Sequence, residues 1–167
     1  ELFAAESFNA DRPEAHVRLG DLHAARADRS AAEREYRLAL ARDPTHLATW
    51  SNLAALMQAS DRADEATQLL RDGLRAKPGA AELQHALGLA LIRAGDRKQA
   101  LQLLGAAAQG APANPRFAFV HAVARHDTGD LQGALRSLRA ALKRHPHERD
   151  LAQALDDYRR ESAAAQR

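Results

Sequence analysis

Four prolines are evenly spaced along the chain, at Pro44, Pro78, Pro112 and Pro146. A fixed interval of about 34 residues indicates tandem copies of one small structural unit, and a proline just beyond a helix stops that helix without breaking it. Each such unit buries its apolar face against its neighbours, so the product is an extended scaffold rather than a globule with one deep pocket. The spacing therefore predicts a repeat array that binds other molecules on a long surface.

Small and bulky residues recur with the same interval as the prolines. Twelve residues before each proline stands an alanine: Ala32, Ala66, Ala100 and Ala134. Eight residues before each stands a large side chain: Tyr36, Leu70, Leu104 and Leu138. Small residues let two helix backbones approach closely, and large ones fill the space that remains. The pattern predicts tightly packed helices, which fits an aromatic content of only 4% and the abundance of alanine, leucine and arginine.

These positions together resemble the tetratricopeptide repeat, whose pattern is Trp, Leu-Gly, Tyr, Ala, Phe, Ala, Pro over about 34 residues. The first copy matches at Leu19, Gly20, Ala32, Tyr36, Ala39 and Pro44, and the second at Trp50, Leu53, Ala66 and Pro78. The resemblance covers about residues 13–146. It implies an all-α fold, a right-handed α-solenoid of antiparallel helix pairs with four repeats, a partial N-terminal helix and a C-terminal capping helix.

The resemblance and the local helix-end signals divide the chain. We expect the second helix of a truncated preceding repeat at 1–12, repeats at 13–46, 47–80, 81–114 and 115–148, a capping helix at 147–161 and a frayed tail at 162–167. Capping boxes are expected at Ser30–Glu33 and at Asp96, turns at Gly95 and Gly129, and a helix start at Asn114-Pro115.

The N-terminal segment lacks a partner helix in this chain. Leu2, Phe3 and Phe8 would then expose an apolar surface. We expect the native protein to continue upstream with more repeats or another domain. Two alternatives are a short amphipathic helix that caps the array by itself and a homo-oligomer in which two copies bury these ends against each other.

In tetratricopeptide arrays the first helix of each pair lines the concave face, so the resemblance places a peptide-binding surface there. The residues that it implies are Asn52, Gln58, His85, Leu89, Ile92, Arg93, Arg116, Phe119, Val123 and His126. The four large apolar members form an expected seat for a hydrophobic anchor, and the arginines and histidines would contact carboxylates around it. The alternative is that the apolar members only pack helix against helix.

Two residues of the fourth repeat depart from the family pattern. His121 stands where leucine is expected, and Arg125 stands where an aromatic residue is expected. Either a hydrogen-bonded core histidine lies beside an arginine that extends to the surface, or the helix is rotated so that Phe119, Val120 and Val123 point inward.

Several function classes are excluded by what the sequence lacks. It has no cysteine and no glycine-rich phosphate loop, and its eight histidines show no helical metal-site spacing, so we expect no metal, no cofactor and no enzymatic activity. It has no apolar stretch long enough to insert into a membrane. A formal charge of +2 with few aromatic residues argues against nucleic acid. The chaperone-clamp residues of some tetratricopeptide proteins are also absent, since only Asn52 fits that pattern.

The sequence thus predicts a protein–protein interaction scaffold that docks a peptide or partner protein on the concave face. The alternative is a structural or oligomerisation array, or a spacer attached to an upstream catalytic or cofactor-bearing domain. The alanine and arginine content is typical of bacteria, in the cytoplasm or the periplasm. The third and fourth repeats are similar to C-terminal arrays of some bacterial multihaem cytochrome-like proteins, which would imply a periplasmic setting with haem bound upstream.

Overall fold

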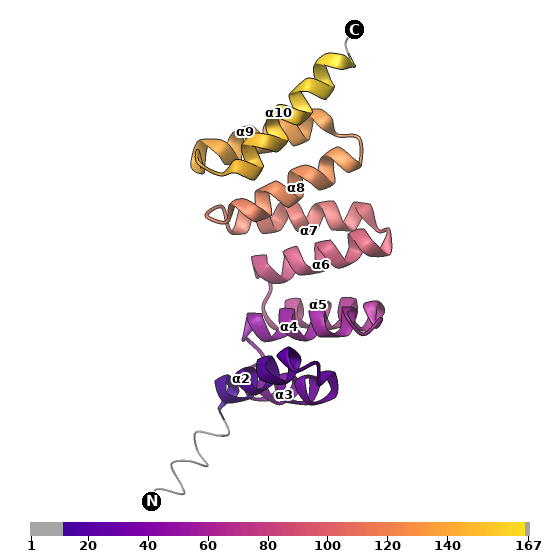
Figure 1. Ribbon diagram of the computed structural model, residues 1–167, viewed down its shortest axis with the longest axis vertical. Coiled ribbons are helices and arrows are strands. Elements are labelled where there is room, and N and C mark those ends of the chain that lie inside the picture. The colour runs from indigo at the N-terminus through magenta and orange to yellow at the C-terminus, as the bar shows by residue number, and fades with distance from the viewer. Residues whose placement is uncertain (1–11, 166–167) are drawn as a thin grey trace, which may run out of the picture. The chain divides into compact units, whose positions relative to one another are not determined.

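The computed structural model describes residues 12–165, and within this range the chain is a series of α-helices joined by short turns (Figure 1). The helices are α2 (Pro13–Ala25), α3 (Arg29–Arg42), α4 (Leu47–Gln58), α5 (Ala63–Ala76), α6 (Ala81–Ala94), α7 (Arg97–Gly110), α8 (Pro115–Asp127), α9 (Leu131–Arg144) and α10 (Arg149–Ala164). The described residues include no strand. The all-α fold class is confirmed, and the helix expected at 1–12 lies, except for its last residue, outside the described part of the chain.

The chain divides into two compact units, residues 1–86 and 87–167, here called the N-terminal unit and the C-terminal unit. In the N-terminal unit α2 packs against α3, α3 against α4, and α4 against α5. In the C-terminal unit α7 packs against α8, α8 against α9, and α9 against α10, while α10 also contacts α8. Within each unit, helices that follow one another in sequence are therefore neighbours in space, as in a repeat array.

Close packing of α2 against α3 depends on a glycine in the N-terminal unit. Gly20 is buried, and a Cβ atom added there would lie 2.5 Å from Cε1 of Tyr36. The Tyr36 ring is itself buried, and its hydroxyl donates a hydrogen bond to Oδ1 of Asp21 at 2.7 Å. The ring is thus held in the space that a side chain at position 20 would need.

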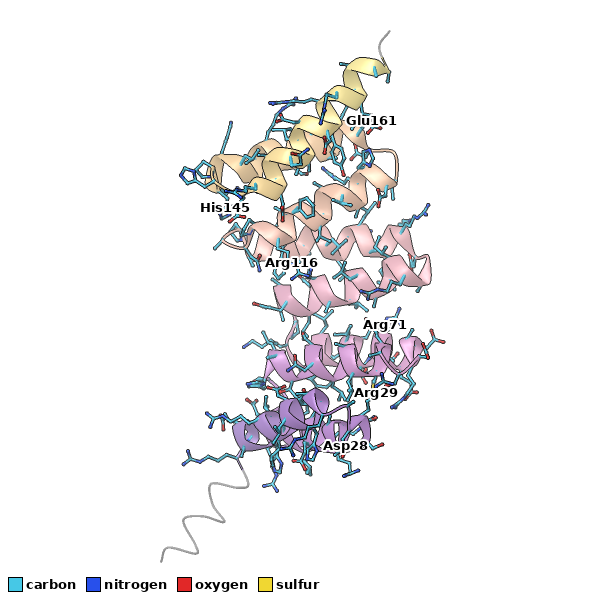
Figure 2. All side chains as sticks on the ribbon, in the orientation of Figure 1. Asp28, Arg29, Arg71, Arg116, His145 and Glu161 are labelled. Atoms are coloured by element: carbon cyan, nitrogen blue, oxygen red, sulfur yellow. The ribbon has the colours of Figure 1, made fainter. Side chains whose placement is uncertain are left out.

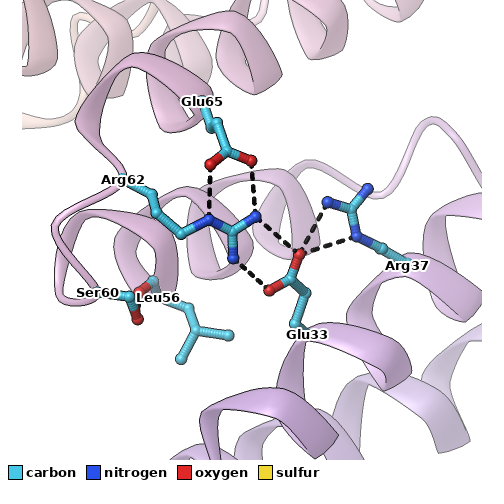
Figure 3. A network of polar contacts seen from close by, with 6 residues as sticks. All are labelled: Glu33, Arg37, Leu56, Ser60, Arg62 and Glu65. Atoms are coloured by element: carbon cyan, nitrogen blue, oxygen red, sulfur yellow. Dashed lines mark hydrogen bonds and ion pairs between the residues drawn. The ribbon is translucent and has the colours of Figure 1, made fainter.

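A network of charged side chains joins α3 to the start of α5 (Figure 3). Glu33 Oε2 accepts a hydrogen bond from Arg62 Nη1 at 2.6 Å, and its Oε1 accepts one from Arg37 Nη2 at 2.8 Å. Arg62 Nε also donates to Glu65 Oε1 at 2.8 Å. The hydrogen bond from Arg62 holds the pKa of Glu33 below its usual range, so this carboxylate stays ionised at neutral pH.

The expected capping box at Ser30 and Glu33 is wrong. Helix α3 begins two residues earlier, at Arg29, and Oδ1 of the N-cap residue Asp28 accepts the hydrogen bond of the Ala31 backbone N–H at 3.1 Å. Aspartate directly after the turn is already placed to cap the helix, so Ser30 falls within its first turn. The Glu33 side chain is then free of a capping role and pairs with Arg62.

The turns inside the helix pairs repeat with the interval of the prolines. Ala27, Asp61, Gly95 and Gly129 have positive φ angles of 60°, 58°, 85° and 87°. The turns expected at the two glycines are confirmed, and the first two pairs use the same left-handed conformation with alanine and aspartate. Directly after the third turn, Asp96 caps α7 by accepting a backbone N–H, as expected.

A hydrophobic core cluster of the C-terminal unit lies between α8, α9 and α10. Its buried members are Ala122, Ala134, Leu135, Leu138, Ala141, Leu151 and Leu155. The unit extends further than the sequence predicts, because α10 continues through Ala164 although a frayed tail was expected from Ser162. Nε2 of Gln132 on α9 donates to Oγ of Ser162 at 3.2 Å, and this contact attaches the last turns of α10 to the unit.

Candidate functional site

Helices α8 and α10 form one face of the C-terminal unit, and each is positioned by its first residues. Asn114 precedes α8, its Oδ1 accepts the backbone N–H of Arg116 at 3.1 Å, and Pro115 occupies the first helical turn, as expected. Helix α10 begins at Arg149, three residues after Pro146. Figure 2 labels Arg116 near the start of α8 and Glu161 toward the end of α10.

Two hollows lie side by side between these helices and share Phe119 and Asp150. The first has a volume of about 410 Å³ and is lined by Pro115, Arg116, Phe119, Val120, Glu148, Asp150 and Leu151. The second has a volume of about 290 Å³ and is lined by Phe119, Val123, Asp150, Gln153, Ala154, Asp157 and Tyr158. We call the two hollows together the α8–α10 groove. Phe119 is half-buried and packs in part against the core, so it contributes both to packing and to the wall of the groove.

Carboxylates outnumber cations among the side chains that line the α8–α10 groove. Glu148 and Asp150 line the first hollow together with Arg116. Asp150 and Asp157 line the second hollow, whose lining includes no cation. The groove thus combines an apolar wall with an acidic border.

His126 on α8 contacts the last turns of α10. The His126 ring stacks on Tyr158 with ring centroids 4.1 Å apart and planes 6° from parallel. Its Nε2 lies 2.7 Å from Oε2 of Glu161, and this hydrogen bond raises the pKa of His126. His126 was expected to bind a ligand, but its ring already holds α10 in place.

A third hollow lies in the N-terminal unit, has a volume of about 340 Å³ and is wide open. It is lined by Asp21, Ala24, Tyr36, Asn52, Ala55 and Leu56. Oδ1 of Asp21 accepts hydrogen bonds from both the Tyr36 hydroxyl and Asn52 Nδ2, the latter at 3.0 Å. Burial, with the Asp21 hydrogen bond adding to it, raises the pKa of Tyr36, so its hydroxyl remains a donor. The Asn52 amide therefore lies in a hollow, and one of its donors is already used.

His121 and Arg125, which depart from the family pattern, are both half-buried. The His121 ring lies against Gly105 of α7, where an added Cβ atom would be 3.2 Å from Nε2. Burial lowers the pKa of His121, and the charge of Arg125 adds to this effect, so the neutral imidazole is favoured. Arg125 Nη1 donates to the Gly133 carbonyl at 3.3 Å, and its Nε lies 3.5 Å from Asp130 Oδ2. This geometry places a half-buried histidine against α7, beside an arginine that contacts Gly133 and Asp130.

The same two side chains line a hollow of about 390 Å³ between α7, α8 and α9, which also includes Ser137 and Arg144. Arg125 Nη1 lies 3.3 Å from the Ser137 hydroxyl oxygen. The guanidinium is therefore engaged from several sides by groups of its own unit.

The structure distributes the expected binding residues among different environments. Arg116, Phe119 and Val123 line the α8–α10 groove. His85 is buried and only 8% exposed, so it is not offered to a ligand in this conformation. The remaining residues, Gln58, Leu89, Ile92 and Arg93, line neither hollow of the groove.

Most of the groove residues that sequence reasoning missed lie on α10. The helix was interpreted only as a cap, yet Asp150, Gln153, Ala154 and Asp157 form one side of the groove. The repeat interval contained the necessary information, because Gln153 stands one full interval after Phe119. Helix α10 therefore stands at the place of a first helix in a further repeat and extends the same face.

Within residues 12–165, no three histidine, aspartate or glutamate side chains gather in a way that would hold a metal ion. No helix in this part of the chain is both long and apolar enough to cross a membrane.

Comparisons with known proteins relate this geometry to proteins of similar sequence or structure. No protein-family model matches the chain. Protein FlbA of Caulobacter vibrioides is 32% identical over 117 residues, which is 70% of this chain and 19% of FlbA. The chain thus spans about a fifth of the length of the curated relative that it matches.

Solved structures match over nearly the whole chain. PilF of Pseudomonas aeruginosa superposes with a TM-score of 0.77 at 19% identity, over 91% of this chain and 69% of PilF. YrrB, described as a TPR protein with an unusual peptide-binding site, superposes with a TM-score of 0.70 at 19% identity, over 96% of this chain and 83% of YrrB.

Proposed function

The chain has the tetratricopeptide-repeat fold, and we propose that it is an interaction scaffold that docks a peptide segment of a partner protein in the α8–α10 groove. The fold itself supports protein or peptide binding in general terms, since a related structure is described by its peptide-binding site. The groove offers such a segment both apolar surface and polar groups.

The position of Phe119 is the observation that carries the proposal. Its ring is half-buried and forms the wall that the two hollows share. An apolar side chain that covers exposed ring surface gains about 25 cal/mol for each Å² removed from water. Two neighbouring hollows on one ring suit two anchoring side chains of a peptide. Such side chains alternate along an extended peptide and are spaced i, i+4 along a helical one.

A second candidate function is a rigid array within a longer protein. One observation favours it: the region that matches this chain makes up only 19% of FlbA, so that relative contains it within a much longer chain. The two functions are compatible, because an array that docks a peptide also sets the distance between the domains on either side of it.

The docking proposal is tested by filling the groove. Ala154 lines the second hollow, so Ala154→Phe occupies its space without removing any existing side chain from the core. Ala152 is exposed on the same helix and lines neither hollow, so Ala152→Phe is a matched control. A phage library of random dodecapeptides is selected on the immobilised chain of 167 residues, and the selected peptides are then titrated against both variants by fluorescence anisotropy.

We expect the selected peptides to bind the original chain and the Ala152→Phe variant equally, and the Ala154→Phe variant about tenfold more weakly or worse, which corresponds to a loss of about 1.4 kcal/mol or more. Circular dichroism verifies that each variant keeps its helix content. If Ala154→Phe unfolds the chain, Phe119→Ala replaces it, because this variant removes the groove wall instead of filling the groove. Selection of no peptide, or equal binding by the groove variants and the control, would overturn the proposal.

A further inference from the structure

We propose that the segment docked in the α8–α10 groove is cationic, with a lysine or arginine next to an apolar anchor. This inference rests on the proposed function and specifies the chemistry of the partner. It differs from the sequence-based expectation of an acidic partner, in which arginines and histidines of the first helices were to contact carboxylates.

The charges around the groove favour a positive ligand. Three carboxylates line it, those of Glu148, Asp150 and Asp157, against the single cation of Arg116. Arg93, the other arginine expected to meet carboxylates, lines neither hollow. An acidic peptide would therefore meet like charges in both hollows, whereas a basic one would meet complementary charges there.

The carboxylates of α10 also stabilise their own helix, and they line the groove at the same time. Asp150 lies in the first turn of the helix, where the partial positive charge of the N-terminus favours a carboxylate regardless of any ligand. Asp157 lies about two turns further on, beyond the range of that effect. Within the chain, Asp157 accepts hydrogen bonds from Gln153 and Arg160, and these hold its pKa below the usual range. Both carboxylates face the second hollow.

The apolar wall makes the groove suited to lysine or arginine rather than to a small cation. Both side chains carry a charged group on an apolar stem of three or four carbons, and such stems lie along apolar surface while the head reaches polar groups. A stem that lies along Phe119 brings the head toward Asp150, because both residues line each of the two hollows. An aromatic ring also attracts a cation placed over its face.

The experiment uses the peptides from the phage selection and neighbouring aspartates of α10. Each selected peptide is synthesised in its original form and with every lysine and arginine replaced by glutamate. Asp157→Asn removes a charge that lines the groove, whereas Asp156→Asn removes one that does not. The two aspartates are matched, since both are exposed and each pairs with an arginine three residues later.

We expect lysine or arginine to be enriched next to apolar residues in the selected peptides. Asp157→Asn should weaken their binding about two- to fivefold, as is usual for exposed ion pairs, and the double variant Asp150→Asn/Asp157→Asn should weaken it further. Asp156→Asn should leave binding unchanged. Raising the salt concentration should also weaken binding, because exposed charge pairs are screened.

The outcomes separate this inference from the proposed function. Peptides that lose affinity for the Ala154→Phe variant but are neutral or acidic, or that bind Asp157→Asn as well as the original chain, would overturn the cationic partner and leave the docking groove intact. Peptides that bind the Ala154→Phe variant normally would overturn both. A concentration-dependent dimer that Ala154→Phe abolishes would identify a second copy of this chain as the occupant and would also overturn the inference.

Discussion

The left-handed turns inside the four helix pairs allow a sharp test of how local backbone conformation contributes to stability. Ala27, Asp61, Gly95 and Gly129 occupy equivalent positions with positive φ. A Cβ atom added at either glycine would have no heavy atom within 4 Å, so substitution there changes backbone conformational preference without a clash. We expect Gly95→Ala to destabilise the fold and Ala27→Gly to stabilise it.

The magnitude follows from two opposing terms. The left-handed conformation costs a residue with a Cβ atom about 1–2 kcal/mol. Glycine, in turn, loses more conformational freedom on folding, which costs about 0.4–1 kcal/mol relative to alanine. The difference is about 0.5–1 kcal/mol in favour of glycine at these turns. Asp61→Gly should raise the free energy of unfolding less than Ala27→Gly, because aspartate tolerates positive φ better than alanine.

Urea unfolding followed by circular dichroism measures these changes. With a slope of about 2 kcal/mol per molar urea, Gly95→Ala should lower the midpoint by about 0.3–0.5 M and Ala27→Gly should raise it by a similar amount. Ala152→Gly is the control for the opposite sign, since this exposed position lies inside α10, where glycine costs about 1 kcal/mol relative to alanine. The reasoning is refuted if Ala27→Gly destabilises the chain as Ala152→Gly does, or if Gly95→Ala has no effect at an unchanged slope.

Three further outcomes are expected. The hydrogen bond to Glu161 raises the pKa of His126 above its ordinary 6.5. This contact therefore stabilises the fold fully below pH 6.5, and its contribution is lost as the pH rises through the folded-state pKa. His126→Gln should reduce the difference between urea midpoints measured at about pH 6 and about pH 8.5. Gly20→Ala should lower the free energy of unfolding by about 1–3 kcal/mol through its clash with Tyr36. In a thermodynamic cycle, the double variant Gly20→Ala/Tyr36→Leu should lose less stability than the sum of the two single variants. Additive losses would show that the ring is not the obstacle. Asn114→Ala should cost about 1 kcal/mol in urea unfolding through loss of the α8 cap, and an unchanged midpoint would contradict that role.

The architecture was predictable because its cause repeats in the sequence. A helix end needs a stop and a turn needs a permissive residue, and both requirements return once in every repeat, at the prolines and at the positions of Gly95 and Gly129. The start of α3 was less predictable, because Asp28 and Ser30 can both cap a helix and only the observed turn at Ala27 selects the aspartate.

The residues that line the α8–α10 groove were predictable on α8 and much less so elsewhere. Arg116, Phe119 and Val123 line a groove because a first helix turns the same positions toward the same face in every repeat. Neither the burial of His85 nor the use of His126 in holding α10 follows from position alone, since both depend on which side chains pack against them.

The charge of the groove could not be predicted from the residues of one helix. Arg116 on α8 indicates an acidic ligand when that helix is considered by itself, and helix α10 was set aside as a cap. A groove between two helices takes its electrostatic potential from both walls, however, and the side formed by α10 and the residue before it contributes three carboxylates. The carboxylates on this side therefore set the charge of the groove together with Arg116. Where a terminal helix stands at the position of a first helix, its charges have to be counted with those of the repeat before it.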